Sequence, residues 1–389
     1  MTKSSGTILD GDSRPGGRGA GRGPRSRRAS APERPLTLIT GGAGFIGTNL
    51  ADRLLSQGAP VLVLDDISRP GAERNLAWLR SRHPGRLQVE IGDVRDGPAV
   101  RRVVGQADRI FHLAAQVAVT SSLADPVRDL EINIRGTLNV LEAARARQRP
   151  PPVLFTSTNK VYGALPDVEL ERRDRRYVPV DPRLAAAGID EQRPLDFHSP
   201  YGCSKGAADQ YVLDYARCFG VPAVVFRMSC IYGPHQCGTE DQGWVAHFLM
   251  RARDQGMLTI YGDGCQVRDI LFVDDLVDAL LLAMRGIDRL AGQAFNIGGG
   301  PANSLSLLEL LDIMAGRLGL EVRTGHAGWR SGDQRYYVTN TGRFSSATGW
   351  SPAISAAEGV SRLHDWLVAG DPAPLLTRCA SPGTPATVC

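Results

Sequence analysis

The chain has 389 residues, of which 42% are hydrophobic and 22% charged, a composition typical of a soluble globular protein rather than a disordered or fibrous one. No apolar run is long enough for a transmembrane helix, which needs about 20 residues. Residues 1–34 hold eight basic and three acidic side chains, which leaves 37 basic and 38 acidic ones elsewhere. A nearly neutral body gives no electrostatic reason to expect a nucleic-acid or membrane partner.

The two ends of the chain differ in composition from the body. Residues 1–34 are rich in Gly and Arg and lack the apolar stretch of a signal peptide, so we expect a disordered basic tail. Residues 371–389 are rich in Pro, Ser and Thr and are expected to form a flexible tail. Seven scattered cysteines without a C-x-x-C pair predict no metal site and a cytoplasmic location.

Short apolar, β-prone runs alternate with helical stretches through the first half of the body. The runs cover residues 36–40, 61–64, 87–91, 109–113 and 153–157. Helical stretches such as 132–147 separate most of them. Strands and helices that alternate in this way predict an α/β fold of the Rossmann type, a doubly wound parallel sheet with helices on both faces.

The alternation weakens beyond residue 232, which predicts a smaller C-terminal substrate-binding lobe. A strand and helix at 269–284 are expected to return to the main sheet, and the charged stretch 164–197 to form a solvated loop. The predicted Rossmann domain therefore comprises 35–232 plus 267–287. The predicted lobe comprises 233–266 plus 288–370.

A glycine turn joins the first strand to the first helix. Gly41, Gly44 and Gly47 would let the backbone approach a pyrophosphate and would direct helix N–H groups at it. Asp65 ends the second strand, where a carboxylate can accept hydrogen bonds from the hydroxyls of an adenosine ribose. Such an acid would repel a 2′-phosphate, so the pattern predicts NAD rather than NADP.

Tyr201 and Lys205 lie four residues apart near the start of a helix that Ser199 and Pro200 open. Side chains at this spacing share one helix face, so the ammonium is expected to lower the tyrosine pKa and to reach a nicotinamide ribose. A phenolate is a base that can take a hydroxyl proton. Thr158 follows the fifth strand, at the edge where parallel sheets bind ligands, and could share a substrate oxygen with the tyrosine.

These motifs, in order and spacing, resemble the extended short-chain dehydrogenase/reductase family of nucleotide-sugar epimerases and dehydratases. The resemblance runs from about residue 36 to residue 366. It is carried by 41–47, Asp65, the GDVRD at 92–96, the HLAA at 112–115, Asn133, Thr158, Tyr201, Lys205, Arg268 and Asp269.

The resemblance implies a role for each matching position. It implies three catalytic residues, Thr158, Tyr201 and Lys205. The implied NAD-binding residues are Gly41, Gly44, Phe45, Ile46, Gly47, Asp65, Asp93, Val94, Ala114, Asn133, Tyr201 and Lys205. The implied substrate-binding residues are Thr158, Asn159, Lys160, Arg268, Arg330 and Arg335, with the arginines expected at the nucleotide diphosphate.

The resemblance further implies inversion of a sugar carbon through a transient keto intermediate, with C2 of a CDP-sugar as the expected position. Dehydratases of the family place Asp-Glu directly after the active-site threonine, where this chain has Asn159 and Lys160, and this difference favours plain epimerisation. Relatives usually pair through helices of the cofactor domain, so a homodimer or homotetramer is expected.

Several alternatives to this activity remain open at this point. One is a C4- or C2-epimerase, or a 4,6-dehydratase, acting on a GDP- or UDP-sugar. Another is a net NAD-dependent oxidoreductase, and a third is a nicotinamide-binding regulator that has lost activity.

Overall fold

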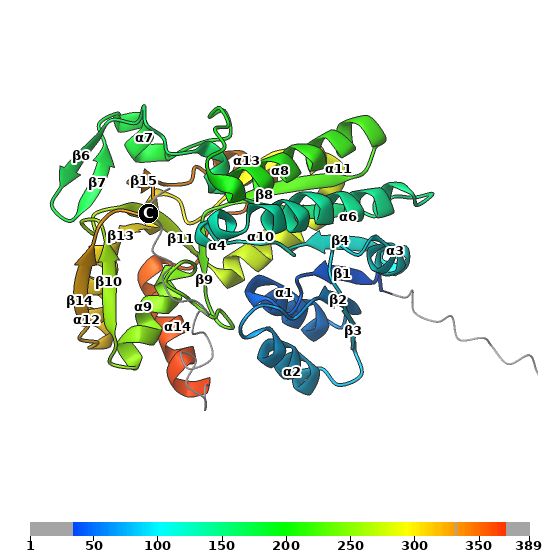
Figure 1. Cartoon of the computed structure of the whole chain (residues 1–389), viewed down its shortest axis with the longest axis horizontal. Helices are drawn as coiled ribbons and strands as arrows, with labels where there is room; N and C mark the ends of the chain where they lie inside the picture. Colours follow the sequence, from blue (N-terminus) through cyan, green and yellow to red (C-terminus); the bar gives the residue numbers. More distant parts are fainter. Residues whose placement is uncertain (1–33, 331–332, 371–389) are drawn as a thin grey trace, which may run out of the picture. The chain divides into compact units, whose positions relative to one another are not determined.

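A seven-stranded parallel sheet forms the centre of the computed structural model, which describes residues 34–330 and 333–370 (Figure 1). The strand order is β12-β8-β5-β4-β1-β2-β3. The order reverses between β1 and β4, the switch point at which sheets of this kind bind ligands. The strands are β1 (Thr37–Thr40), β2 (Val61–Asp65), β3 (Leu87–Ile91), β4 (Arg109–His112), β5 (Val153–Thr158), β8 (Ala223–Met228) and β12 (Ala294–Ile297).

Helices cover both faces of this sheet, because successive strand residues point to opposite sides. Ile39 of β1 packs in one buried cluster with residues of α1 (Phe45–Ser56) and α10 (Val273–Arg285). Its neighbour Leu38 packs in a second cluster with residues of three other helices. These are α3 (Gly97–Gln106), α6 (Gly136–Arg145) and α8 (Ser199–Phe219). The predicted doubly wound α/β fold is confirmed.

The smaller lobe is built on two small sheets and three helices around a separate buried cluster. In one sheet β10 (Met257–Tyr261) pairs with β14 (Arg323–Ala327). In the other, β11 (Val267–Phe272) pairs with three short strands. These are β9 (Cys230–Tyr232), β13 (Ser304–Ser306) and β15 (Tyr336–Tyr337). The helices are α9 (Trp244–Arg253), α12 (Leu307–Leu318) and α14 (Ala356–Gly370).

The strands on either side of α10 belong to other domains than predicted. β11 was expected in the main sheet, but it pairs within the lobe, and only the helix after it returns to the sheet. Residues 288–370 were expected to belong to the lobe, but β12 is an edge strand of the main sheet. The reason is burial on both faces, because Phe295 and Ile297 pack in one cluster with Phe344 of α13 (Gly342–Thr348), while Ala294 packs in the cluster on the other face.

The stretch expected as a solvated loop contains a hairpin of β6 (Leu170–Arg173) and β7 (Arg176–Pro179), followed by α7 (Pro182–Ala187). The remaining short elements complete the described chain. They are α2 (Ala72–Arg82), α4 (Val119–Ala124), α5 (Pro126–Leu130), η1 (Glu131–Arg135), η2 (Asn159–Tyr162), α11 (Ile287–Leu290) and η3 (Pro301–Asn303). None of the helices in the described ranges is both long and apolar enough to cross a bilayer. The tails predicted at 1–34 and 371–389 fall outside these ranges, apart from residue 34.

Candidate active site

Three adjoining cavities lie where the central strands end. The first, of about 380 Å³, is lined by Thr158 and Tyr201, and the second, of about 340 Å³, by Asp65. The third, of about 220 Å³, is lined by Arg268. The first cavity shares wall residues with each of the other two, among them Lys160 with the third. The three therefore form a groove that runs from the end of β2 into the lobe.

The glycine turn brings the backbone of β1 and α1 together at the first two cavities. Gly41 has φ +71°, and a Cβ there would lie 2.7 Å from the backbone nitrogen of Ala114. A Cβ on Gly47 would lie 2.3 Å from the carbonyl oxygen of Gly41. Helix α1 begins at Phe45, and no side chain caps its first N–H groups. Such a turn leaves both the space and the donors that a pyrophosphate requires.

Three aspartates line the second cavity, Asp65 and Asp66 at the end of β2 and Asp93 shortly after β3. Asp65 is 8% exposed and accepts hydrogen bonds of 2.9 Å from the backbone N–H groups of Ala43 and Ile67. Burial raises the pKa of this carboxyl group despite these bonds. Asp93 lies beyond β3, and although burial opposes it, hydrogen bonds from Arg95 hold the pKa of Asp93 below its usual value.

Tyr201 and Thr158 meet in the first cavity. The tyrosine is buried in the first turn of α8, where its backbone N–H donates a 3.1 Å bond to the hydroxyl of Ser122. Burial raises the pKa of Tyr201 to about 12, and its hydrogen bond with Thr158 and the nearby charge of Arg69 oppose that rise. The phenol is therefore protonated at neutral pH, and a positive charge favours its ionisation.

Lys205 lies one helical turn after Tyr201 but contacts other groups. Its Nζ donates a 2.6 Å bond to the carbonyl oxygen of Thr156 and lies 4.2 Å from the centre of the Phe155 ring. Burial lowers the pKa of Lys205 to about 7. The four-residue spacing predicts that the lysine lowers the tyrosine pKa, whereas in this structure it is the positive charge of Arg69 that opposes the rise of that pKa. The reason is that the strand carbonyl and the aromatic ring hold the ammonium.

The groove brings together most of the residues expected to bind cofactor. Asn133 is an exception, because it is buried behind the wall of the second cavity. Its side-chain oxygen accepts a 2.9 Å bond from the backbone of Gln116, and its Nδ2 donates a 2.9 Å bond to Ser204. Ser204 in turn donates to Asp129. The asparagine thus ties the cavity wall to α8 rather than lining the groove.

The residues predicted to bind substrate do not all line the same cavity. Lys160 and Arg268 line the third cavity together, and burial, with repulsion from Arg268, lowers the pKa of Lys160 to about 8. Arg330 lines the same cavity, donates a 3.1 Å bond to Asp241 and stacks 3.7 Å from the Tyr261 ring centre.

Asn159 lies in the wall of the first cavity beside Thr158. Arg335 does not line any of the three cavities. It is exposed and lies over the rings of Tyr177 and Trp329, with distances to the ring centres of 5.7 and 5.5 Å.

Comparison with known proteins identifies the class of protein. Residues 37–298 match the NAD dependent epimerase/dehydratase family. The chain is 46% identical over 336 residues to CDP-paratose 2-epimerase of Salmonella typhi, covering 85% of this chain and 98% of that protein. It is 34% identical to dTDP-glucose 4,6-dehydratase of Streptomyces griseus, over 85% of this chain and 93% of that one. The solved UDP-glucose 4-epimerase of Thermus thermophilus, in complex with NAD, matches with a TM-score of 0.72 and 29% identity, covering 86% of this chain and 100% of that one.

The chain therefore belongs to the NAD dependent epimerase/dehydratase family. It is an enzyme, and NAD is its cofactor. The resemblance inferred from the motifs is confirmed. The groove fits a dinucleotide, since the glycine turn presents N–H groups where a pyrophosphate would lie and Asp65 presents a carboxylate in the adjoining cavity.

Proposed function

We propose that this enzyme inverts C2 of a CDP-sugar, with CDP-paratose and CDP-tyvelose as the interconverted pair. The observation that carries the proposal is the contact between Thr158 and Tyr201 inside a cavity that joins the cofactor groove to the lobe. The choice of CDP-paratose rests on the 46% identical relative of that name.

The reacting hydroxyl would lie between Thr158 and Tyr201. Thr158 orients that hydroxyl, while Tyr201 takes the proton from its oxygen and returns it to the same oxygen after the keto sugar has turned its opposite face toward the cofactor. The positive charge of Arg69 favours the phenolate that this step requires. NAD, when bound, accepts the hydride from the same carbon and gives it back, so no net redox change occurs.

Apolar side chains around the reacting groups would exclude water from the oxidised intermediate. Those lining the first cavity include Leu113, Val117, Val119, Met228, Ile231 and Val245. The substrate diphosphate would be held by Lys160 and Arg268, two half-buried cations on the wall of the third cavity, with Arg330 also in that wall. The proposal does not use Arg335.

The main alternative is a dehydratase, as in the relative from Streptomyces griseus. Elimination of water requires an acid and a base beside the oxidised sugar. Among the described residues, the wall of the first cavity contains one carboxylate, that of Asp241. It forms an ion pair with Arg330 at 3.1 Å. Asn159 and Lys160, directly after the threonine, supply no carboxylate. This arrangement favours epimerisation.

A substrate panel tests the proposal. The purified enzyme is incubated with CDP-, GDP- and UDP-sugars, and proton NMR follows the appearance of a second anomeric signal while absorbance at about 340 nm follows NADH. We expect an inverted product from the CDP-sugar only, without accumulation of NADH. A product from a GDP- or UDP-sugar alone would contradict the nucleotide assignment, and NADH formed in step with product would indicate a net oxidoreductase.

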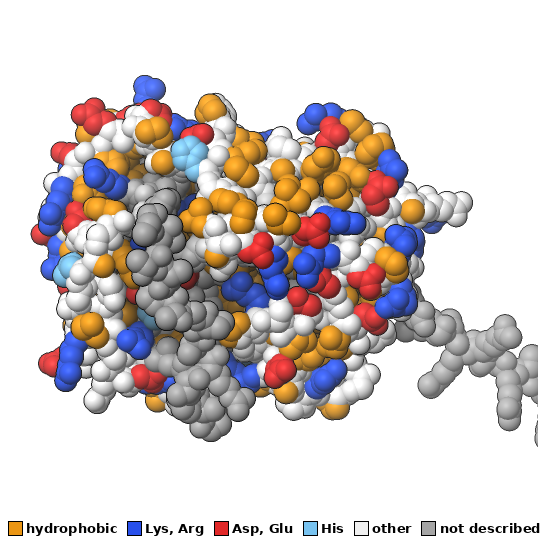
Figure 2. All heavy atoms as spheres, viewed as in Figure 1, with side chains coloured by type: hydrophobic (Ala, Val, Ile, Leu, Met, Phe, Trp, Pro, Cys, Tyr) orange, Lys and Arg blue, Asp and Glu red, His pale blue; other side chains and the backbone are white. Residues whose placement is uncertain are grey.

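We further propose that the enzyme acts in the cytoplasm as a homodimer or homotetramer. Apolar side chains gather over α4, α6 and α8 in Figure 2. The exposed apolar residues of α4, α5 and α8 are Leu123, Val127, Leu130, Tyr211 and Phe219. A contiguous apolar patch of this kind is typical of a subunit interface. Light scattering should give a dimer or tetramer, and Val127→Asp should shift it toward the monomer.

A further inference from the structure

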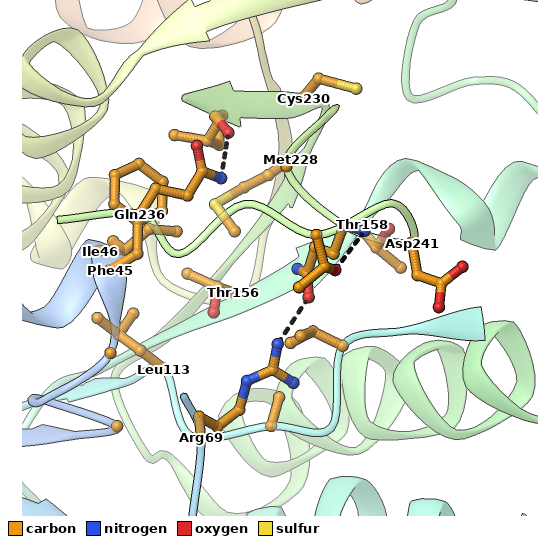
Figure 3. A pocket seen from close by; sticks show the side chains of 18 of the residues that line it. Phe45, Ile46, Arg69, Leu113, Thr156, Thr158, Met228, Cys230, Gln236 and Asp241 are labelled. Carbon is orange, nitrogen blue, oxygen red and sulfur yellow. Dashed lines mark hydrogen bonds between the residues drawn. The ribbon is translucent and has the colours of Figure 1, made fainter. Parts of the chain in front are cut away.

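Arg69 crosses the cofactor groove. It lies between β2 and α2 and lines both the first and the second cavity. Its Nη2 donates a 3.0 Å hydrogen bond to the side-chain oxygen of Gln242, which is 173 residues further along the chain. Figure 3 shows the arginine side chain extending into the cavity, with a dashed line marking this bond. Gln242 belongs to the connection between β9 and α9, so the bond joins the sheet to the lobe across the groove.

The segments that carry the two side chains are held in place. On the sheet side, Ile67 has φ +54°, and its N–H is bonded to Asp65 at 2.9 Å. On the lobe side, the N–H of Thr239 donates a 2.8 Å bond to the carbonyl oxygen of Gln242, and Asp241 accepts a 3.1 Å bond from Arg330. Hydrogen bonds therefore hold the segments at both ends of the Arg69–Gln242 bond.

The arginine side chain extends from an exposed segment into the groove. Ser68, Arg69 and Pro70 are all exposed residues, while burial of the guanidinium in the groove lowers the pKa of Arg69. A dinucleotide must occupy both the second cavity, at Asp65, and the first, at Tyr201. Arg69 lines both cavities and its bond with Gln242 spans the groove, so a dinucleotide that enters from the side of this bond requires it to open.

We propose that Arg69 and Gln242 form a latch that opens to admit NAD and then closes over the bound dinucleotide, which slows its release. Closure places a guanidinium beside a diphosphate, a pairing that strengthens the closed state. The benefit of retention rests on the proposed function, because a cofactor that left in reduced form would strand the keto sugar. The latch itself concerns cofactor release and can be measured without any sugar.

The test follows NADH release from the full-length enzyme. The enzyme is loaded with NADH and mixed with excess NAD⁺, and the loss of bound-NADH fluorescence gives the release rate. We expect Arg69→Ala and Gln242→Ala each to release NADH roughly tenfold faster, as for the loss of one hydrogen bond to a charged group. The double variant should be no faster than Arg69→Ala alone, since removal of the arginine already loses both the bond with Gln242 and the contact with the diphosphate.

Two matched variants sharpen the test. Gln242→Glu keeps an acceptor for Arg69 and should release NADH as slowly as the wild type or more slowly. Arg80→Ala removes an exposed arginine of α2, outside the three cavities, and should leave the rate unchanged. An unchanged rate in Arg69→Ala would overturn the proposal. Faster release in Arg69→Ala but not in Gln242→Ala would also overturn it, because the arginine would then act on the cofactor alone.

Discussion

Lys205 and Thr156 are joined by a hydrogen bond of 2.6 Å, from the lysine Nζ to the backbone carbonyl oxygen of the threonine. The bond fixes helix α8 to β5 two residues before Thr158, and so sets the position of Tyr201 relative to that threonine. It also holds the ammonium of Lys205 in the core, since only 3% of this residue is exposed. The lysine that positions the site is thus a desolvated charge in the core.

This burial makes the stability of the enzyme depend on pH. Burial lowers the pKa of Lys205 from 10.5 to about 7, so between these values the unfolded chain binds more protons than the folded one. The lysine contribution to the free energy of unfolding therefore rises with pH through this window. Relative to the wild type, Lys205→Met should be more stable near pH 6 than near pH 9, by ~1 kcal/mol or more. Urea unfolding of both proteins at the two pH values measures the difference, and an equal difference at both would contradict the assignment.

Tyr201→Phe should remove the acid–base group while keeping the packing of the ring. Turnover should fall by a factor of about 10² or more, as is usual for loss of a general base. The NAD content of the purified protein and its melting temperature should stay at wild-type values. Extraction of the nucleotide together with thermal unfolding provides these controls, and wild-type turnover in the variant would refute the role of the tyrosine.

Lys160 should make substrate binding pH-dependent. Burial lowers the pKa of this lysine to about 8, so it is charged below that pH and neutral above it. A diphosphate should therefore bind less tightly as the pH rises through 8, which raises KM with less change in kcat. Lys160→Met should have a high KM without this pH dependence, and Lys160→Arg should keep a low KM at high pH. If Lys160→Met retained the wild-type KM profile, another group would be responsible.

Gly47→Ala should abolish cofactor binding. A Cβ at this position would lie 2.3 Å from the carbonyl oxygen of Gly41 and 2.6 Å from the Cα of Gly42, so the turn would have to move. We expect the variant to purify without NAD and to melt at a lower temperature. Gly105→Ala in α3 is the matched control, since a Cβ there meets no atom within 4 Å. It should keep its NAD and gain slightly in stability, because alanine favours the helix. Equal NAD content in the two variants would contradict this reading of the turn.

Patterns of neighbouring residues predicted most strands of the main sheet, but not the sheet to which every strand belongs. A buried run such as 61–64, closed by Asp65 and followed by a helix, leaves few arrangements other than a parallel sheet. Residues 294–297 form an equally short run, apolar except for Asn296, but whether such a strand pairs with β8 or within the lobe depends on contacts distant in sequence. The packing of Phe295 against Phe344 contributes to that choice.

The same limit applies to the site. Four-residue spacing indicates that Tyr201 and Lys205 share a helix face, but it does not reveal that the ammonium bonds to the carbonyl oxygen of Thr156. Arg69 and Gln242 carry no motif, and 173 residues separate them, so only the folded chain brings them together. The glycine turn was accessible from sequence because its residues are neighbours along the chain.

The central claim is that one hydride leaves the inverted carbon and returns to it. Proton NMR of the reaction in D₂O with the CDP-sugar tests this most directly, because a hydride held by the cofactor does not exchange with solvent, whereas a proton removed by a base does. We expect an inverted product with no deuterium at C2. Deuterium at C2 of the product would contradict this claim and would indicate deprotonation of the carbon instead.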